Sequence, residues 1–143
     1  MAAAKKILMI DDDVNLVNVF RLVCEKKGYE FHSAGSAVGG LAAIEAVEPD
    51  LIILDVIMED FVAGFRVVSE LRADSSSRYA RFSGVPIIML TSVTSKTQVD
   101  FAERVGTALL PVDAFVEKPV KPSEMLATIE SVLERAASGA REA

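Results

Sequence analysis

Short apolar segments alternate along the chain with longer segments in which apolar residues recur at helical spacing. The short segments are mostly apolar or rich in residues that favour strands, and turn residues bound them, which predicts a strand at each. Strands are predicted at residues 6–10, 29–34, 51–54, 86–90 and 114–117. The third is continuously apolar, as expected for a parallel strand that is covered on both faces.

A helix is predicted after each strand. The first carries Leu16, Phe20 and Cys24 one turn apart, so Cys24 is expected in the core, and Gly28 ends this helix. The remaining helices are predicted to begin near Ser36, near Phe65, at residue 99 and after Pro122. Strand–helix repeats of this kind predict an α/β fold, a doubly wound parallel sheet with helices on both faces.

Length, composition and charge narrow the possible functions. A chain of 143 residues, 51% of them hydrophobic, fits one folded domain. No apolar run is long enough to span a bilayer or to form a signal peptide, so a cytoplasmic location without membrane contact is predicted. The single cysteine agrees with a reducing compartment. The net charge of −6 argues against direct nucleic-acid binding.

Polar side chains follow four of the predicted strands at the point where each ends. They are Asp11, Asp12 and Asp13 after the first strand, Asp55 after the third, Thr91 and Ser92 after the fourth, and Lys118 after the fifth. In open parallel sheets, binding sites form outside the carboxyl ends of the strands. We therefore expect these side chains to meet, except Asp13, which is placed to cap the following helix.

Clustered carboxylates repel one another unless a cation joins them, and Mg²⁺ prefers such oxygen ligands. Asp55 could then attack a phosphoryl group and form an aspartyl phosphate. Phosphoryl transfer needs mainly positioning and charge neutralisation. The Lys118 ammonium would supply positive charge, and the Thr91 hydroxyl would donate a hydrogen bond to a phosphoryl oxygen.

Four motifs in this order resemble the response-regulator receiver domain of bacterial two-component signalling. They are ILMIDDD at 7–13, DLIILDVIM at 50–58, PIIMLTS at 86–92 and FVEKP at 115–119. The resemblance covers residues 5–136 and implies a CheY-like, flavodoxin-like (βα)5 fold with strand order 2-1-3-4-5. It leaves 137–143 as a flexible tail, and no output domain is expected after it.

The resemblance also implies a metal site and a phosphoryl donor. Mg²⁺ would be held by Asp12, Asp55 and the backbone carbonyl of Ile57, with Asp11 assisting through water. Asp55 would receive the phosphoryl group from a sensor histidine kinase or a histidine phosphotransfer protein. The domain would not be an enzyme in the usual sense, because it would catalyse only its own phosphoryl transfer and slow autodephosphorylation.

A switch is implied as well. Thr91 would move toward the phosphoryl group, and Phe115 would fill the space that Thr91 leaves. The surface of the fourth helix, the fifth strand and the fifth helix would then change. This surface would bind an unknown downstream protein or form a homodimer.

The chain departs from the family pattern in the loop after Asp55. Glu59 stands where the family usually has proline, and one extra residue precedes Gly64. Ile57 and Val93 occupy positions that tune loss of the phosphoryl group in the family. Both are apolar and cannot orient an attacking water, which predicts a long-lived phosphoryl group.

Two alternatives come from other functional classes. Phosphatases of the haloacid-dehalogenase type also use a strand-end aspartate, and Asp11 with Asp13 matches their Asp-x-Asp spacing superficially. A receiver-like protein-binding module that is never phosphorylated is the other alternative, and the altered loop after Asp55 is its best support.

Overall fold

The computed structural model describes residues 4–55, 84–92, 114–118 and 120–138, together with Val67, Leu71 and Phe82. The strands in these ranges are β1 (Lys6–Ile10), β2 (Glu30–Ala34), β3 (Leu51–Asp55), β4 (Ile87–Ser92) and β5 (Ala114–Lys118). The helices are α1 (Val14–Lys26), α2 (Ala37–Val47) and α5 (Pro122–Ser138). None of these helices is both long and apolar enough to cross a bilayer.

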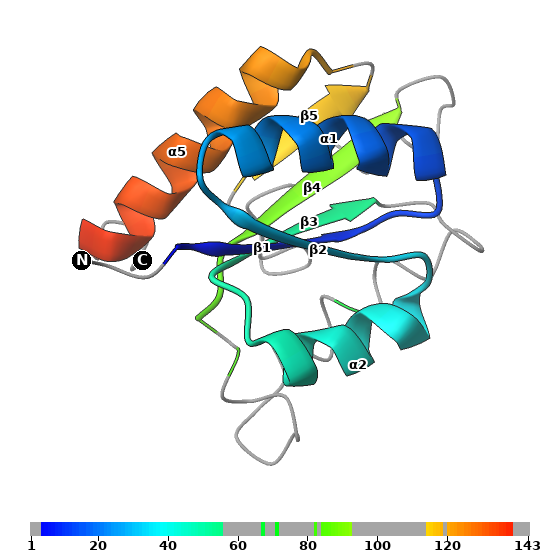
Figure 1. The fold of residues 1–143 in the computed structure, drawn as a ribbon. Helices are drawn as coiled ribbons and strands as arrows, with labels where there is room; N and C mark the ends of the chain where they lie inside the picture. Colours follow the sequence, from blue (N-terminus) through cyan, green and yellow to red (C-terminus); the bar gives the residue numbers. More distant parts are fainter. Residues whose placement is uncertain are drawn as a thin grey trace.

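The strands form one parallel sheet in the order β2-β1-β3-β4-β5, which confirms the predicted fold class and strand order. Helices α1 and α5 cover one face of the sheet, and α2 covers the other (Figure 1). Ile10 of β1 pairs with Ala34 on one side and with Leu54 on the other. The parallel register therefore brings the carboxyl ends of neighbouring strands to the same edge.

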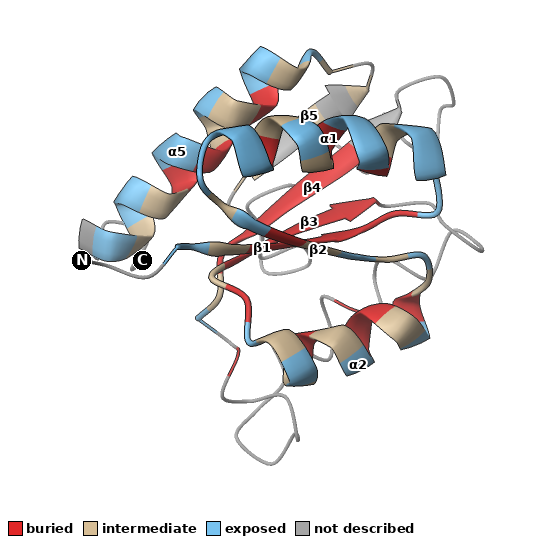
Figure 2. Ribbon diagram, viewed as in Figure 1, coloured by how far each residue is buried: buried red, intermediate tan, exposed pale blue. Residues whose placement is uncertain are grey.

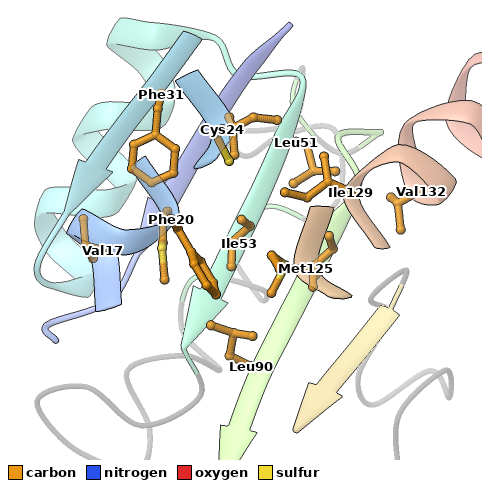
Figure 3. Packing of buried hydrophobic residues seen from close by; sticks show 13 residues of the cluster. Val17, Phe20, Cys24, Phe31, Leu51, Ile53, Leu90, Met125, Ile129 and Val132 are labelled. Carbon is orange, nitrogen blue, oxygen red and sulfur yellow. The ribbon is translucent and has the colours of Figure 1, made fainter. Parts of the chain in front are cut away.

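Alternation along the strands divides the core into two clusters, because successive side chains point to opposite faces of a sheet. Leu8, Ile10 and Leu54 pack toward α2. On the other face, Phe20 of α1 and Met125 of α5 pack beside Ile53 of β3 (Figure 3). The central strands are buried between the helices, whose outer faces are exposed (Figure 2).

Local signals set the limits of the first two helices, as predicted. Asp13 caps α1, since its carboxylate accepts the N–H of Leu16 at 3.1 Å. The Ser36 hydroxyl accepts the N–H of Gly39 at 3.0 Å and caps α2. Gly28, just beyond the end of α1, has a φ of 92°, a conformation that glycine adopts without strain.

Several element boundaries differ from the predictions. The third, fourth and fifth strands run further than predicted, because the ladder continues through Asp55 opposite Leu90 and through Ser92 opposite Lys118. Helix α5 continues to Ser138, two residues beyond the predicted end of the domain at 136. Val67 and Leu71 are helical and buried, as the predicted third helix requires. The predicted fourth helix at 99–105 lies outside the described residues.

Candidate functional site

Asp11 lies directly after β1, where the strand meets the loop that leads into α1. Its backbone N–H donates to the carbonyl of Ala34 at 3.0 Å, so the residue is still tied to β2. Its Oδ1 accepts the N–H of Asp13 at 2.9 Å. Only 2% of the residue is exposed. Asp11 therefore presents a carboxylate whose position is held by backbone contacts on both sides.

Two further carboxylates lie beside Asp11. Asp55 is the last residue of β3 and is 5% exposed, whereas Asp12 is exposed to solvent. Carboxylate oxygens of Asp11, Asp12 and Asp55 all lie within 4.8 Å of one another, a spacing that suits a metal ion. The third of the consecutive aspartates, Asp13, is instead engaged in capping α1.

Lys118 reaches this cluster from β5, which is two strands away from β3 in the sheet. Adjacent strands are roughly 4.8 Å apart, so the lysine side chain must extend across the end of β4. Its Nζ lies 3.4 Å from Oδ2 of Asp11 and 3.4 Å from Oδ2 of Asp55. Burial by itself lowers the pKa of Lys118, but the carboxylates of Asp55 and Asp11 outweigh burial and raise this pKa above its ordinary value.

The charges of this site do not balance. Among the described residues, three carboxylates and one ammonium leave a formal charge of −2. Oδ2 of Asp11 is buried and accepts no hydrogen bond from any residue that the structure describes. The ammonium at 3.4 Å is further away than the 2.7–2.9 Å that is typical of a charge-assisted hydrogen bond. A divalent cation would neutralise the excess charge and give this oxygen a closer partner than the ammonium, so the residues fit Mg²⁺.

The other predicted site residues are only partly placed. Thr91 lies in β4 opposite Glu117, and Phe115 lies in β5 opposite Met89. Both therefore lie on the strands that adjoin the site, as predicted. Ile57, Glu59, Gly64 and Val93 lie outside the described residues, so the metal-ligand role of the Ile57 carbonyl stays a prediction.

A pocket of about 230 Å³ beside Asp11 and Asp12 was not anticipated from the sequence. Arg21 and Asn18 of α1 line it on one side, and Ser33 lines it on the other. The Arg21 guanidinium donates to the Ser33 hydroxyl at 3.2 Å. No motif marks these residues, because they meet only when α1 packs against β2.

The chain matches the model of the response regulator receiver domain over residues 7–130. The chain belongs to this family. Receiver domains are the phosphoryl acceptors of two-component signalling, and the acidic cluster is compatible with the Mg²⁺ binding that is general to the family. The family assignment confirms the resemblance that the four motifs carried.

Sequence relatives agree with this assignment. The DNA-binding response regulator MtrA from Mycobacterium tuberculosis is 32% identical over 131 residues, which are 92% of this chain and 51% of that protein. The probable transcriptional regulator ycf27 from Cyanophora paradoxa is 34% identical and is covered to 49%. The chain thus spans about half the length of these relatives.

Solved structures show the same architecture. A CheY-like receiver domain protein from Methanospirillum hungatei superposes with a TM-score of 0.76 at 27% identity, covering 95% of this chain and 98% of that one. The chemotaxis protein CheY4 from Vibrio cholerae gives a TM-score of 0.74 at 28% identity, covering 91% of this chain and 99% of that one.

The phosphatase alternative finds no support, because Asp13 caps α1 instead of pairing with Asp11 in the site.

Proposed function

We propose that Asp55 is the residue of this receiver domain that accepts the phosphoryl group. The observation that carries the proposal is the buried Asp55 carboxylate at the end of β3, with the carboxylates of Asp11 and Asp12 and the ammonium of Lys118 gathered around it. Clustered ionisable groups at the carboxyl edge of a parallel sheet are typical of functional sites. The opposite edge of the described sheet holds no comparable cluster of carboxylates.

In the proposed reaction, a carboxylate oxygen of Asp55 attacks the phosphorus of a phosphohistidine. The new O–P bond forms as the N–P bond of the donor breaks, and the departing imidazole nitrogen keeps the electron pair and takes up a proton. Lys118 stabilises the negative charge on the transferring oxygens, because its ammonium already lies at the Asp55 carboxylate. Thr91 donates a hydrogen bond to one phosphoryl oxygen.

Mg²⁺, when bound, would neutralise charge on the phosphoryl oxygens and on the carboxylates. We assign its binding to Asp11, Asp12, Asp55 and the backbone carbonyl of Ile57. The buried Oδ2 of Asp11 supports this assignment, because it lies within the cluster without a hydrogen bond from the described residues. Asp12 is exposed and can exchange water for a ligand contact without a large change in burial.

Phosphorylation would be read out through a packing change. Phe115 would follow Thr91 inward, and the surface that includes β5 and α5 would change for a downstream protein or for a second copy of the chain. A sensor histidine kinase or a histidine phosphotransfer protein would be the donor. We place the receiver domain at residues 5–136, as the motifs indicate, and propose that it acts in the cytoplasm, where response regulators generally act.

Nucleic acid is not proposed as a direct partner of this chain. MtrA is a DNA-binding response regulator that is about twice as long as the matched region. The net charge of −6 on the present chain opposes contact with phosphate backbones.

The domain would catalyse only its own phosphorylation and a slow loss of the phosphoryl group.

The test is the intact mass of the protein after treatment with phosphoramidate and Mg²⁺. The wild type should gain the mass of one phosphoryl group, and Asp55→Asn should gain none. Asp50→Asn is the matched control, because this aspartate lies at the opposite edge of the sheet and should leave the mass gain intact. Absence of any Mg²⁺-dependent gain in the wild type would favour the non-phosphorylated binding module.

The same labelled protein tests the predicted lifetime of the phosphoryl group. Since Ile57 and Val93 cannot orient a water, the label should persist well beyond seconds at neutral pH in Mg²⁺. Decay within seconds would contradict this part of the proposal.

A further inference from the structure

Strand β2 forms one outer edge of the sheet. It pairs with β1, and no helix or strand that the structure describes lies beyond its other side (Figure 1). Glu30 donates its N–H inward, to the carbonyl of Lys5 at 2.9 Å. Backbone groups alternate in direction along a strand, so Phe31 and Ser33 direct theirs outward. This edge therefore offers main-chain donors and acceptors to another strand.

An imidazole and a carboxylate lie together on this strand. Nε2 of His32 and Oε2 of Glu30 are 2.6 Å apart, and residues two positions apart project from the same face of a strand. The side chains are 36% and 49% exposed. Among the described residues, no third carboxylate, thiol or imidazole completes a metal-ligand group with them. The pair therefore offers two of the four ligands that a tetrahedral Zn²⁺ site takes.

Little movement is needed for this pair to bind an ion. Ligand atoms of a tetrahedral zinc site lie roughly 3.4 Å apart, somewhat further than the present contact between His32 and Glu30. The hydrogen bond from His32 lowers the pKa of Glu30, so the carboxylate is ionised at neutral pH. Both side chains are exposed enough to separate and admit a cation between them.

A second copy of the chain can supply the other two ligands. Two β2 strands that pair antiparallel about a two-fold axis at Phe31 would exchange the outward backbone bonds of this residue. Glu30 of each copy would then lie directly opposite His32 of the other, at positions where Cα atoms are about 4.5 Å apart. Two imidazoles and two carboxylates would thus surround the axis on one face of the joined sheet.

This register is complementary in charge as well as in hydrogen bonding. Each carboxylate faces an imidazole across the axis, whereas like charges directly opposite one another destabilise a strand pair. The carboxylates of the two copies nevertheless bring excess negative charge to one face, and charged side chains of this kind protect a free edge from pairing. One Zn²⁺ ion would cancel that charge. Pairing of the two edges is therefore favoured when the ion is bound.

We infer that Glu30 and His32 form half of a Zn²⁺ site that a second copy of the chain completes, with the two β2 strands paired edge to edge. The site uses none of the residues of the acidic cluster. It therefore does not depend on whether Asp55 accepts a phosphoryl group.

The test is sedimentation velocity during titration with Zn²⁺, in excess Mg²⁺. The wild type should be a monomer without Zn²⁺ and a dimer with it, whereas His32→Gln and Glu30→Gln should lose the dimer. Glu134→Gln is the matched control, because this exposed glutamate lies on α5, and it should dimerise as the wild type does. In calorimetry, the wild type should bind one more ion per two chains than His32→Gln does.

Hydrogen exchange tests the strand pairing itself. The outward N–H of Phe31 should exchange more slowly once Zn²⁺ has formed the dimer, because it becomes bonded to the second copy. Unchanged exchange at Phe31 in a Zn²⁺-bound dimer would overturn the inference. A wild type that stays monomeric in saturating Zn²⁺ would also overturn it, as would a dimer that forms equally well in His32→Gln. Circular dichroism establishes that each variant is folded, and both substituted side chains are solvent-accessible, so folding should be retained.

Discussion

The two edges of the sheet use the same kinds of residue in opposite ways. At the amino edge, Oδ2 of Asp50 accepts the N–H of Lys6 at 2.8 Å, and the Lys6 ammonium donates to the carbonyl of Val47 at 3.2 Å. At the carboxyl edge, the carboxylates of Asp11 and Asp55 face the ammonium of Lys118 at 3.4 Å. Backbone groups satisfy the first set, whereas the second set consists of side chains that face one another.

The contacts at the two edges therefore have different consequences, one for the stability of the fold and the other for the binding of a cation. The amino-edge bonds tie the beginning of β1 to the beginning of β3, because Asp50 also donates its N–H to the Lys6 carbonyl at 2.8 Å. The carboxyl-edge groups carry an excess negative charge in a buried place, which is unfavourable until a cation binds. The amino edge therefore stabilises the fold, and the carboxyl edge gathers charges that a cation would help to neutralise.

The largest effect is expected from Asp11→Asn at the carboxyl edge. An amide oxygen is neutral and a weaker ligand, so the affinity for Mg²⁺ should fall about 100-fold, the upper end of losses seen when the support of a metal site is removed. Calorimetric titration measures this change. Asp50→Asn should leave the affinity unaltered, and an equal fall in both variants would erase the distinction between the edges.

Asp50→Ala should produce the next largest effect, this time on folding. The part-buried N–H of Lys6 would lose its carboxylate partner, and the free energy of unfolding should fall by about 2 kcal/mol. Urea unfolding followed by circular dichroism measures it. Asp55 should still be phosphorylated in the folded variant. Loss of this phosphorylation would mean that the amino edge also shapes the site.

Lys118→Met should move metal affinity in the opposite direction. The ammonium competes with Mg²⁺ for Oδ2 of Asp11 and of Asp55, so its removal should tighten Mg²⁺ binding about tenfold, a typical coupling between two binding events. Phosphorylation should nonetheless become slower, because the positive charge beside Asp55 is lost. Lys27→Met serves as control, since Lys27 pairs with Glu130 on the exposed surface at 3.9 Å. Weaker Mg²⁺ binding in Lys118→Met would disprove the competition.

A smaller effect is expected from Asp13→Ala, which removes the cap of α1. The free energy of unfolding should fall by about 1 kcal/mol, as is usual for loss of a capping side chain. Ser36→Ala, at the cap of α2, should cost a similar amount. The Kd for Mg²⁺ should stay constant in Asp13→Ala, and a clear change would return this residue to the acidic site.

The smallest effect is expected at Cys24, which is buried in the core and belongs to neither set of contacts. Burial, aided by Glu25, raises the pKa of its thiol from 9.0 to about 11. The native protein should therefore resist alkylation at neutral pH, and the rate should keep increasing as the pH rises from 9 toward 11. A rate that levels off near pH 9 would indicate an exposed thiol of ordinary pKa.

Local pattern was sufficient for much of the fold. The apolar run at residues 51–54 predicted a strand that is covered on both faces, and β3 is buried throughout. Asp13 and Ser36 were recognisable as caps because capping depends on residues within one turn. The strand order came from the family resemblance and not from the periodicity, since no local signal states which strands are neighbours.

By itself, the sequence determined which side chains stand at the strand ends, because periodicity and turn residues act over a few positions. It therefore identified Asp11, Asp55 and Lys118 as candidates. Only the tertiary structure decided that Lys118 crosses the end of β4 to reach both carboxylates, and that Gly40 lies against Ile10. These contacts join residues far apart in the chain, and their distances depend on the packing of whole elements rather than on any local spacing.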